Sequence, residues 1–163
     1  MVEEERGPKL RATYLGVGEF GEDISGILGR VLKALTQAPL VKLRSMVVFG
    51  SRARGDWKPW SDTDVVLIVE VKKPLKWGTL WELGLPEDVI VDAHRAYIEP
   101  RIFTPEGFRR ALSLGSLTAL DALEEGVVLY DDGYWREMKE LFSKMKRSGQ
   151  IEKMPFGWKI RTT

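Results

Sequence analysis

Two pairs of polar residues lie on either side of a loop between two apolar runs. Gly50 and Ser51 end the first run, and Asp62 and Asp64 begin the second. Glycine lets a ligand approach the backbone closely, and a serine hydroxyl with adjacent amides forms a pocket of donors suited to phosphate oxygens. Residues i and i+2 of a strand face the same side, so the two carboxylates project together, roughly 6–7 Å apart at the backbone. Such anions repel each other, and a divalent cation relieves that repulsion. Because magnesium binds carboxylate and substrate phosphate oxygens together, the pattern predicts a magnesium and nucleoside triphosphate site.

A third carboxylate would complete a two-metal site, and the apolar run VIVDAH contains one. A buried acid there must be paired, metal-bound or protonated, so Asp92 is the candidate. Asp88 has the same strand parity but follows Pro86-Glu87, where an acid is more easily solvated. The alternative for Asp92 is a salt bridge to a base such as Arg95 or Arg101.

Other side chains near these motifs have two interpretations each. Arg52 and Arg54 either reach phosphate or are solvated surface charges. His94 shares the predicted strand face of Asp92, as a general base or, more often for a lone histidine, as a structural residue. Trp57 and Trp60 flank the predicted site and either stack on a nucleobase or cover the edge of the sheet.

Apolar periodicity gives the elements that must position these residues. Helical spacing predicts helices in residues 20–35, 104–123 and 134–145, with 74–86 partly helical. Residues 41–49, 63–71, 89–98 and 126–130 are predicted strands. The two-sided apolar runs are typical of central strands covered on both faces. The expected fold class is α/β (α+β), a mixed sheet of about four to five strands packed with about four helices.

Length and composition limit the classes of protein that the chain can represent. We interpret the 163 residues as one domain, with a core at about 20–100, a C-terminal helical extension at about 104–147 and a basic tail at 148–163. The formal charge of +1 gives no basis for inferring nucleic-acid binding. The absence of cysteine excludes disulfides, thiolate zinc sites and cysteine nucleophiles. No apolar run reaches the roughly 18 residues that a membrane span needs, so we expect a cytoplasmic protein.

The run GSRARG at 50–55, followed by SDTD at 61–64, resembles the signature of the DNA polymerase beta-like nucleotidyltransferase superfamily. It is most similar to the minimal, single-domain prokaryotic and archaeal (MNT-like) branch. Val91-Asp92 also matches a Val-Asp pair on the next strand of that pattern, and GVVLYDDG at 126–133 resembles C-terminal parts of archaeal members.

The resemblance implies a nucleotidyltransferase fold and a three-acid site. Asp62 and Asp64 would hold two Mg²⁺ ions, with Mn²⁺ as the alternative metal, and Asp92 would complete the first site and orient or deprotonate the acceptor hydroxyl. Ser51 and Arg54, with the amide of Gly50 or its neighbour, would bind the phosphates.

The implied reaction transfers a nucleoside monophosphate, AMP from ATP, to an acceptor hydroxyl with release of pyrophosphate. Two alternatives stay open: an antitoxin-like binding partner of a HEPN-domain protein, and a nucleotide-binding module without turnover. The sequence names neither the acceptor nor the preferred nucleobase. The basic segment 144–161 is either a solvated face or a contact with RNA or a partner protein.

Overall fold

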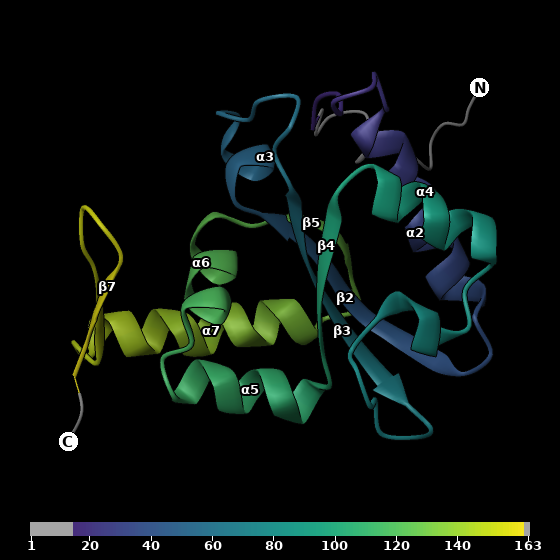
Figure 1. Cartoon of the computed structure of the whole chain (residues 1–163). Coiled ribbons are helices and arrows are strands. Elements are labelled where there is room, and N and C mark those ends of the chain that lie inside the picture. The colour runs from purple at the N-terminus through teal and green to yellow at the C-terminus, as the bar shows by residue number, and fades with distance from the viewer. Residues whose placement is uncertain (1–14, 162–163) are drawn as a thin grey trace, which may run out of the picture.

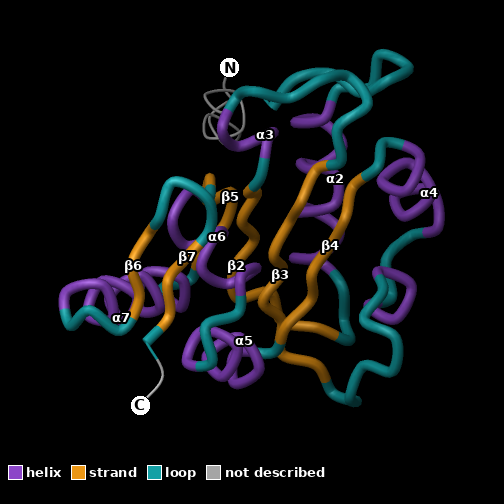
Figure 2. Tube along the Cα trace, turned by 60° about the vertical axis from the view of Figure 1, so that its left-hand side comes forward, coloured by secondary structure: helices purple, strands orange, loops and turns teal. Residues whose placement is uncertain are grey.

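A four-stranded mixed sheet forms the centre of the protein, whose residues 15–161 are described by the computed structural model. The strand order is β4-β3-β2-β5, with β3 and β4 parallel and the other neighbouring pairs antiparallel (Figure 2). The strands of this sheet are β2 (Val41–Phe49), β3 (Thr63–Val71), β4 (Ile98–Phe103) and β5 (Val127–Asp131). The helices are α2 (Ile24–Gln37), α3 (Ser51–Arg54), the 3-10 helix η1 (Leu80–Leu83), α4 (Glu87–Arg95), α5 (Pro105–Ser113), α6 (Leu117–Glu125) and α7 (Tyr134–Arg147).

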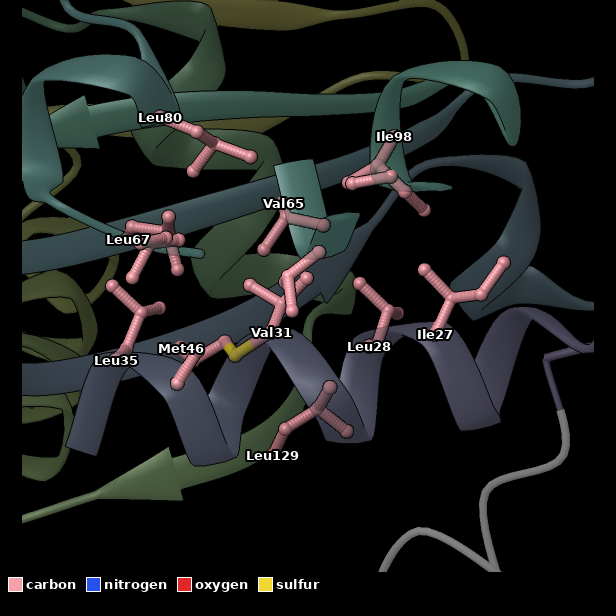
Figure 3. Close-up of a cluster of buried hydrophobic side chains, with 14 of the residues drawn as sticks. Ile27, Leu28, Val31, Leu35, Met46, Val65, Leu67, Leu80, Ile98 and Leu129 are labelled. Carbon is pink, nitrogen blue, oxygen red and sulfur yellow. The ribbon is translucent and has the colours of Figure 1, made fainter. Parts of the chain in front are cut away.

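Helices cover both faces of the sheet, as the two-sided apolar strands require. On one face α2, α4 and η1 pack against alternate strand residues, among them Met46, Val65 and Leu67 (Figures 1 and 3). On the other face α5, α6 and α7 pack against the residues between them, including Val66 and Ile68. Burying apolar side chains on both faces places the charged residues at the ends of the strands.

A register shift in β2 keeps both cores apolar. Leu43 and Met46 both belong to the α2-side core although they are three residues apart, which strict alternation does not allow. The pairing of β2 with β3 shifts between Leu43 and Ser45, so one extra residue restores the alternation.

The structure confirms most of the predicted elements, and strands β2 and β3 have the predicted bounds. The prediction of a strand at 89–98 is wrong: residues 87–95 form helix α4 and the strand follows at 98–103. Val89, Ile90 and Ala93 are the buried face of this helix. Its N-terminal signal was present in Pro86 and the acidic first turn, which favour a helix start.

The C-terminal part differs from the prediction in two ways. The predicted helix at 104–123 is two helices, because Leu114-Gly115-Ser116 interrupts it and Gly115 has a φ of 77°. The basic tail contains a hairpin of β6 (Ile151–Lys153) and β7 (Trp158–Ile160), which packs on the α7 side (Figure 1). In residues 15–161 no helix is both long and apolar enough to span a membrane.

Candidate active site

The loop between β2 and β3 begins with a glycine that its surroundings require. Gly50 has a φ of 81°, a conformation that other residues adopt only at a cost. A Cβ at this position would lie 2.6 Å from Asp64 Oδ2, so the carboxylate occupies the space that a side chain would need. Ser51 follows as the first residue of α3. The structure therefore places the Gly-Ser pair next to Asp64.

Three carboxylates lie on neighbouring strands at this end of the sheet. Asp62 lies directly before β3 and Asp64 is the second residue of that strand, and Asp64 pairs in parallel register with Glu99 of β4. Paired residues of adjacent strands project from the same face, so Glu99 stands beside Asp64. The charges of both Glu99 and Asp62 act on Asp64. Glu99 is thus the third acid that the structure brings to the pair.

Burial and neighbouring charges make ionisation of Asp64 unfavourable. Its side chain is half-buried, and this desolvation is the main cause that raises its pKa above the ordinary value. The negative charges of Glu99 and Asp62 raise the pKa further, while the guanidinium groups of Arg101 and Arg54 oppose the shift. A cation placed among these acids would remove the repulsion.

Asp92 occupies a different part of the molecule. It belongs to α4 rather than to a strand, and its carboxylate accepts a hydrogen bond of 2.7 Å from Arg30 of α2. The prediction that Asp92 lies in a buried apolar strand is therefore wrong. The structure contains the alternative, a salt bridge between Asp92 and a basic side chain. His94 is exposed on the same helix. The signal that sequence reasoning missed was the strand IEPRIF, which follows the helix and contains Glu99.

Two arginines surround the acids of the site. Arg54 donates to both carboxylate oxygens of Glu125, at 3.2 and 3.0 Å, and to Asp56 at 3.3 Å. The hydrogen bond to Glu125 is the main cause that raises the pKa of Arg54. Arg101 lies 3.7 Å from Asp64 and 3.6 Å from Glu99. The guanidinium groups are thus anchored by carboxylates beside the Gly-Ser turn.

Arg52 is neither a phosphate contact nor a surface charge, the two roles predicted for it. Its side chain is 1% exposed, and its guanidinium donates to the backbone carbonyls of Leu15, Val17, Pro59 and Ser61. The ring of Trp57 stacks on this guanidinium at 4.8 Å, whereas Trp60 is exposed. Arg52 therefore ties the loop that leads to Asp62 to the segment that precedes α2.

Within residues 15–161, no group of three or more His, Cys, Asp or Glu side chains is arranged to hold a metal ion by itself. Magnesium commonly binds one or two carboxylates and completes its coordination with water and substrate phosphate oxygens. Asp62, Asp64 and Glu99 are oxygen donors of the kind that magnesium prefers, and the half-buried Asp64 is the one whose ionised form needs a neighbouring cation.

A comparison with one solved structure agrees with this fold. The chain resembles a structure described as a toxin-antitoxin with AMP-PNP, with 18% identity, a TM-score of 0.51 and coverage of 75% of this chain and 88% of that one. A structure described as a "putative nucleotidyltransferase" from Sulfolobus solfataricus has 16% identity, a TM-score of 0.38 and coverage of 80% of this chain and 94% of that one. No curated protein sequence matches the chain significantly.

The family comparison covers the elements that build the site. The family profile described as the nucleotidyltransferase domain matches residues 28–129, from α2 to β5. This match includes the Gly-Ser turn, the two aspartates at the start of β3, Asp62 before the strand and Asp64 within it, and Glu99 of β4. The chain therefore belongs to the nucleotidyltransferase domain family.

Proposed function

We propose that this nucleotidyltransferase moves a nucleoside monophosphate, AMP from ATP, onto an acceptor hydroxyl with release of pyrophosphate. The observation that carries the proposal is the register of β3 and β4, which sets Glu99 beside Asp64 next to the Gly50-Ser51 turn. Acids and phosphate donors on adjacent strand ends are what a reaction at a nucleotide phosphate requires.

We assign the phosphates to Ser51, the amide of Gly50 and Arg54. A hydroxyl, a backbone N–H and a guanidinium are all donors, and charge-assisted bonds from arginine to phosphate are strong. In this arrangement the β and γ phosphates lie against the turn and the α phosphorus lies toward β3 and β4.

Mg²⁺ is the metal that this donor set favours, with Mn²⁺ as the alternative, and Asp62, Asp64 and Glu99 would hold it. When bound, magnesium stabilises the negative charge that develops on the attacking and leaving oxygens. We propose Glu99 in place of Asp92 as the third acid, because Asp92 is already paired with Arg30 on the other side of β4.

The chemical step follows from these roles. The acceptor oxygen forms a bond to the α phosphorus, and the bond from that phosphorus to the bridging oxygen breaks, so that pyrophosphate leaves. Glu99, more exposed than Asp64, accepts the proton of the acceptor hydroxyl. Ser51, the amide of Gly50 and Arg54 orient the nucleotide for this in-line displacement, since positioning supplies much of the rate in phosphoryl transfer.

Nucleoside triphosphate labelled at the α phosphate, with magnesium and cell extract as the source of acceptor, tests the proposal. The wild-type protein should transfer label, and Asp62→Ala and Asp64→Ala should abolish transfer while circular dichroism shows an intact fold. Glu99→Gln should lower transfer about 10²–10⁴-fold, the usual contribution of a general base.

Asp92→Asn is the matched control for the third acid. It removes an exposed ion pair with Arg30, so transfer should stay within about threefold of wild type. Loss of transfer in Asp92→Asn with full transfer in Glu99→Gln would reverse the assignment. Transfer that survives both Asp62→Ala and Asp64→Ala would refute the site itself.

A second candidate, a role as the antitoxin-like partner of another protein, is suggested by the likeness to the toxin-antitoxin structure. The partner class expected from the sequence is a HEPN-domain protein. Affinity purification of the tagged chain from its native host should then yield a stoichiometric complex. Recovery of the chain alone, with transfer activity intact, would favour the enzyme acting without such a partner.

A further inference from the structure

The carboxylate of Glu125 occupies donors that the site needs for phosphate. Glu125 is the last residue of α6, and it accepts a 2.8 Å hydrogen bond from the amide of Gly50. The same carboxylate accepts from Arg54 through both oxygens. These contacts join residues 71 and 75 positions apart in the sequence, so they exist only in the folded chain.

A carboxylate and a phosphate compete for such donors because both present anionic oxygens to N–H groups. The backbone N–H of Gly50 is a single donor, and Glu125 holds it in the described structure. The side chain of Glu125, at the C-terminal end of α6, is 23% exposed. The carboxylate therefore has access to water, into which it can turn when it leaves these donors.

We propose that Glu125 acts as an internal anion that fills the phosphate subsite and sets nucleotide affinity by competing with the incoming triphosphate. The inference rests on the function proposed above. Binding of a polyphosphate requires the Glu125 carboxylate to give up Gly50 and at least part of Arg54. The apparent affinity is then the intrinsic affinity multiplied by the fraction of protein in which Glu125 has left the donors.

The opposite role, in which Glu125 helps binding by holding Arg54 in place, predicts an effect of opposite sign. If Glu125 only positions Arg54, its removal weakens phosphate binding. If Glu125 competes, its removal strengthens binding. A gain of affinity is also a result that partial unfolding does not produce.

The experiment measures dissociation constants for inorganic tripolyphosphate, ATP and adenosine by isothermal titration calorimetry, with wild type and Glu125→Gln. Glutamine keeps the size of the side chain and removes its charge. We expect the Kd of tripolyphosphate and of ATP to fall about tenfold. A change of this size follows if Glu125 holds the donors in about nine of ten wild-type molecules. The Kd of adenosine, which has no phosphate, should not change.

Glu124→Gln is the matched control because it removes the same charge one residue earlier. Glu124 pairs with Lys146 rather than with the turn. If both variants gain affinity equally, the effect is general attraction of a polyanion and the inference is wrong. A gain limited to Glu125→Gln that persists at 0.5 M salt, where the Debye length is only several ångströms, supports direct competition.

Glu125→Ala is a second variant that should also bind tripolyphosphate more tightly than wild type. Unchanged or weaker binding in folded Glu125→Gln and Glu125→Ala overturns the inference while leaving the proposed function intact, provided that wild type binds ATP. If neither wild type nor the two Glu125 variants bind ATP or tripolyphosphate, the proposed function and the inference fail together.

Discussion

At the scale of single residues, the ionised carboxylate of Asp64 is favourable for metal binding in the proposed site but unfavourable for the stability of the fold. Burial and the charges of Glu99 and Asp62 raise its pKa, and Arg101 only partly compensates. Folding therefore disfavours the ionised form of Asp64. At pH values above the ordinary pKa of an aspartate, the folded state is less stable than it would be with a neutral side chain at this position. Below that pKa the carboxyl is protonated in both the folded and unfolded states, and the cost is absent.

Asp64→Asn should raise the stability of the protein at pH 7 and abolish transfer. The gain should decrease as the pH falls through the raised pKa and vanish near pH 3, below the ordinary value of about 3.9. Thermal unfolding at both pH values measures it, and each kcal/mol corresponds to about 2–4 °C in Tm for a domain of this size. Asp62→Asn, at an exposed neighbouring position, should give a smaller gain, because it removes only one of the causes that raise the pKa of Asp64. A lower Tm for Asp64→Asn than for wild type at pH 7 would contradict the prediction.

At the scale of elements, the buried side chain of Arg52 holds the loop between β2 and β3 in place. Its buried guanidinium binds carbonyls of this loop and of the segment that precedes α2, which gives a segment rich in turn residues a fixed path into β3. The sequence motif contains Arg52 and Arg54 two positions apart, and the structure gives them different roles. Arg52 faces the interior, whereas Arg54 lies at the surface of the site.

Arg52→Met should destabilise the fold by about 2–4 kcal/mol, because several buried carbonyls lose their donor. It should also speed chymotryptic cleavage after Trp57 and Trp60, since the loop would no longer be held. Arg54→Met is the matched control: its ion pairs are exposed, so the free energy of unfolding should change by less than about 1 kcal/mol. Urea unfolding compares the two, and equal effects would refute the structural role assigned to Arg52.

A second prediction at this scale concerns β3, where Thr63 lies between the two aspartates. Its hydroxyl is buried, and within residues 15–161 it has no hydrogen-bond partner. Thr63→Val keeps the shape of the side chain and removes the unsatisfied group, which should stabilise the protein by about 1 kcal/mol. Urea unfolding measures the gain, with transfer retained. Destabilisation would show that the hydroxyl is satisfied in solution.

At the scale of the whole molecule, the β6–β7 hairpin extends the core beyond the family match, which ends at residue 129. Ile151 is 1% exposed, and the ring of Trp158 packs edge-to-face on Phe142 of α7 with centroids 5.7 Å apart. The indole N–H of Trp158 donates to Asp121 of α6 at 2.9 Å. The hairpin thus links α6 to α7 on the side of the sheet that faces away from α2.

Trp158→Ala should lower the free energy of unfolding by about 1–3 kcal/mol, because it removes an aromatic contact and a hydrogen bond from a half-buried position. Phe156→Ala in the same hairpin should change stability by less than about 0.5 kcal/mol, since Phe156 is 96% exposed. Chemical denaturation of both variants is the measurement. Comparable losses would mean that the hairpin tip is packed in solution.

The sequence by itself determined the parts of this protein that depend on local patterns. Two-sided apolar runs set β2 and β3. The short spacing of Gly50, Ser51, Asp62 and Asp64 placed the turn and the acid pair at neighbouring ends of these two consecutive strands. The mixed sheet covered by helices on both faces followed from the same two-sided runs.

Only the tertiary structure decided which distant residues join that pair. Glu99 reaches Asp64 through a parallel register that is set after the chain has crossed through α4, and an apolar run of VIV was equally compatible with a strand there. Glu125 and Arg52 likewise gain their roles from contacts across the fold. The physical reason is that periodicity fixes an element and the face it buries, whereas the partner of a charged side chain depends on how whole elements pack.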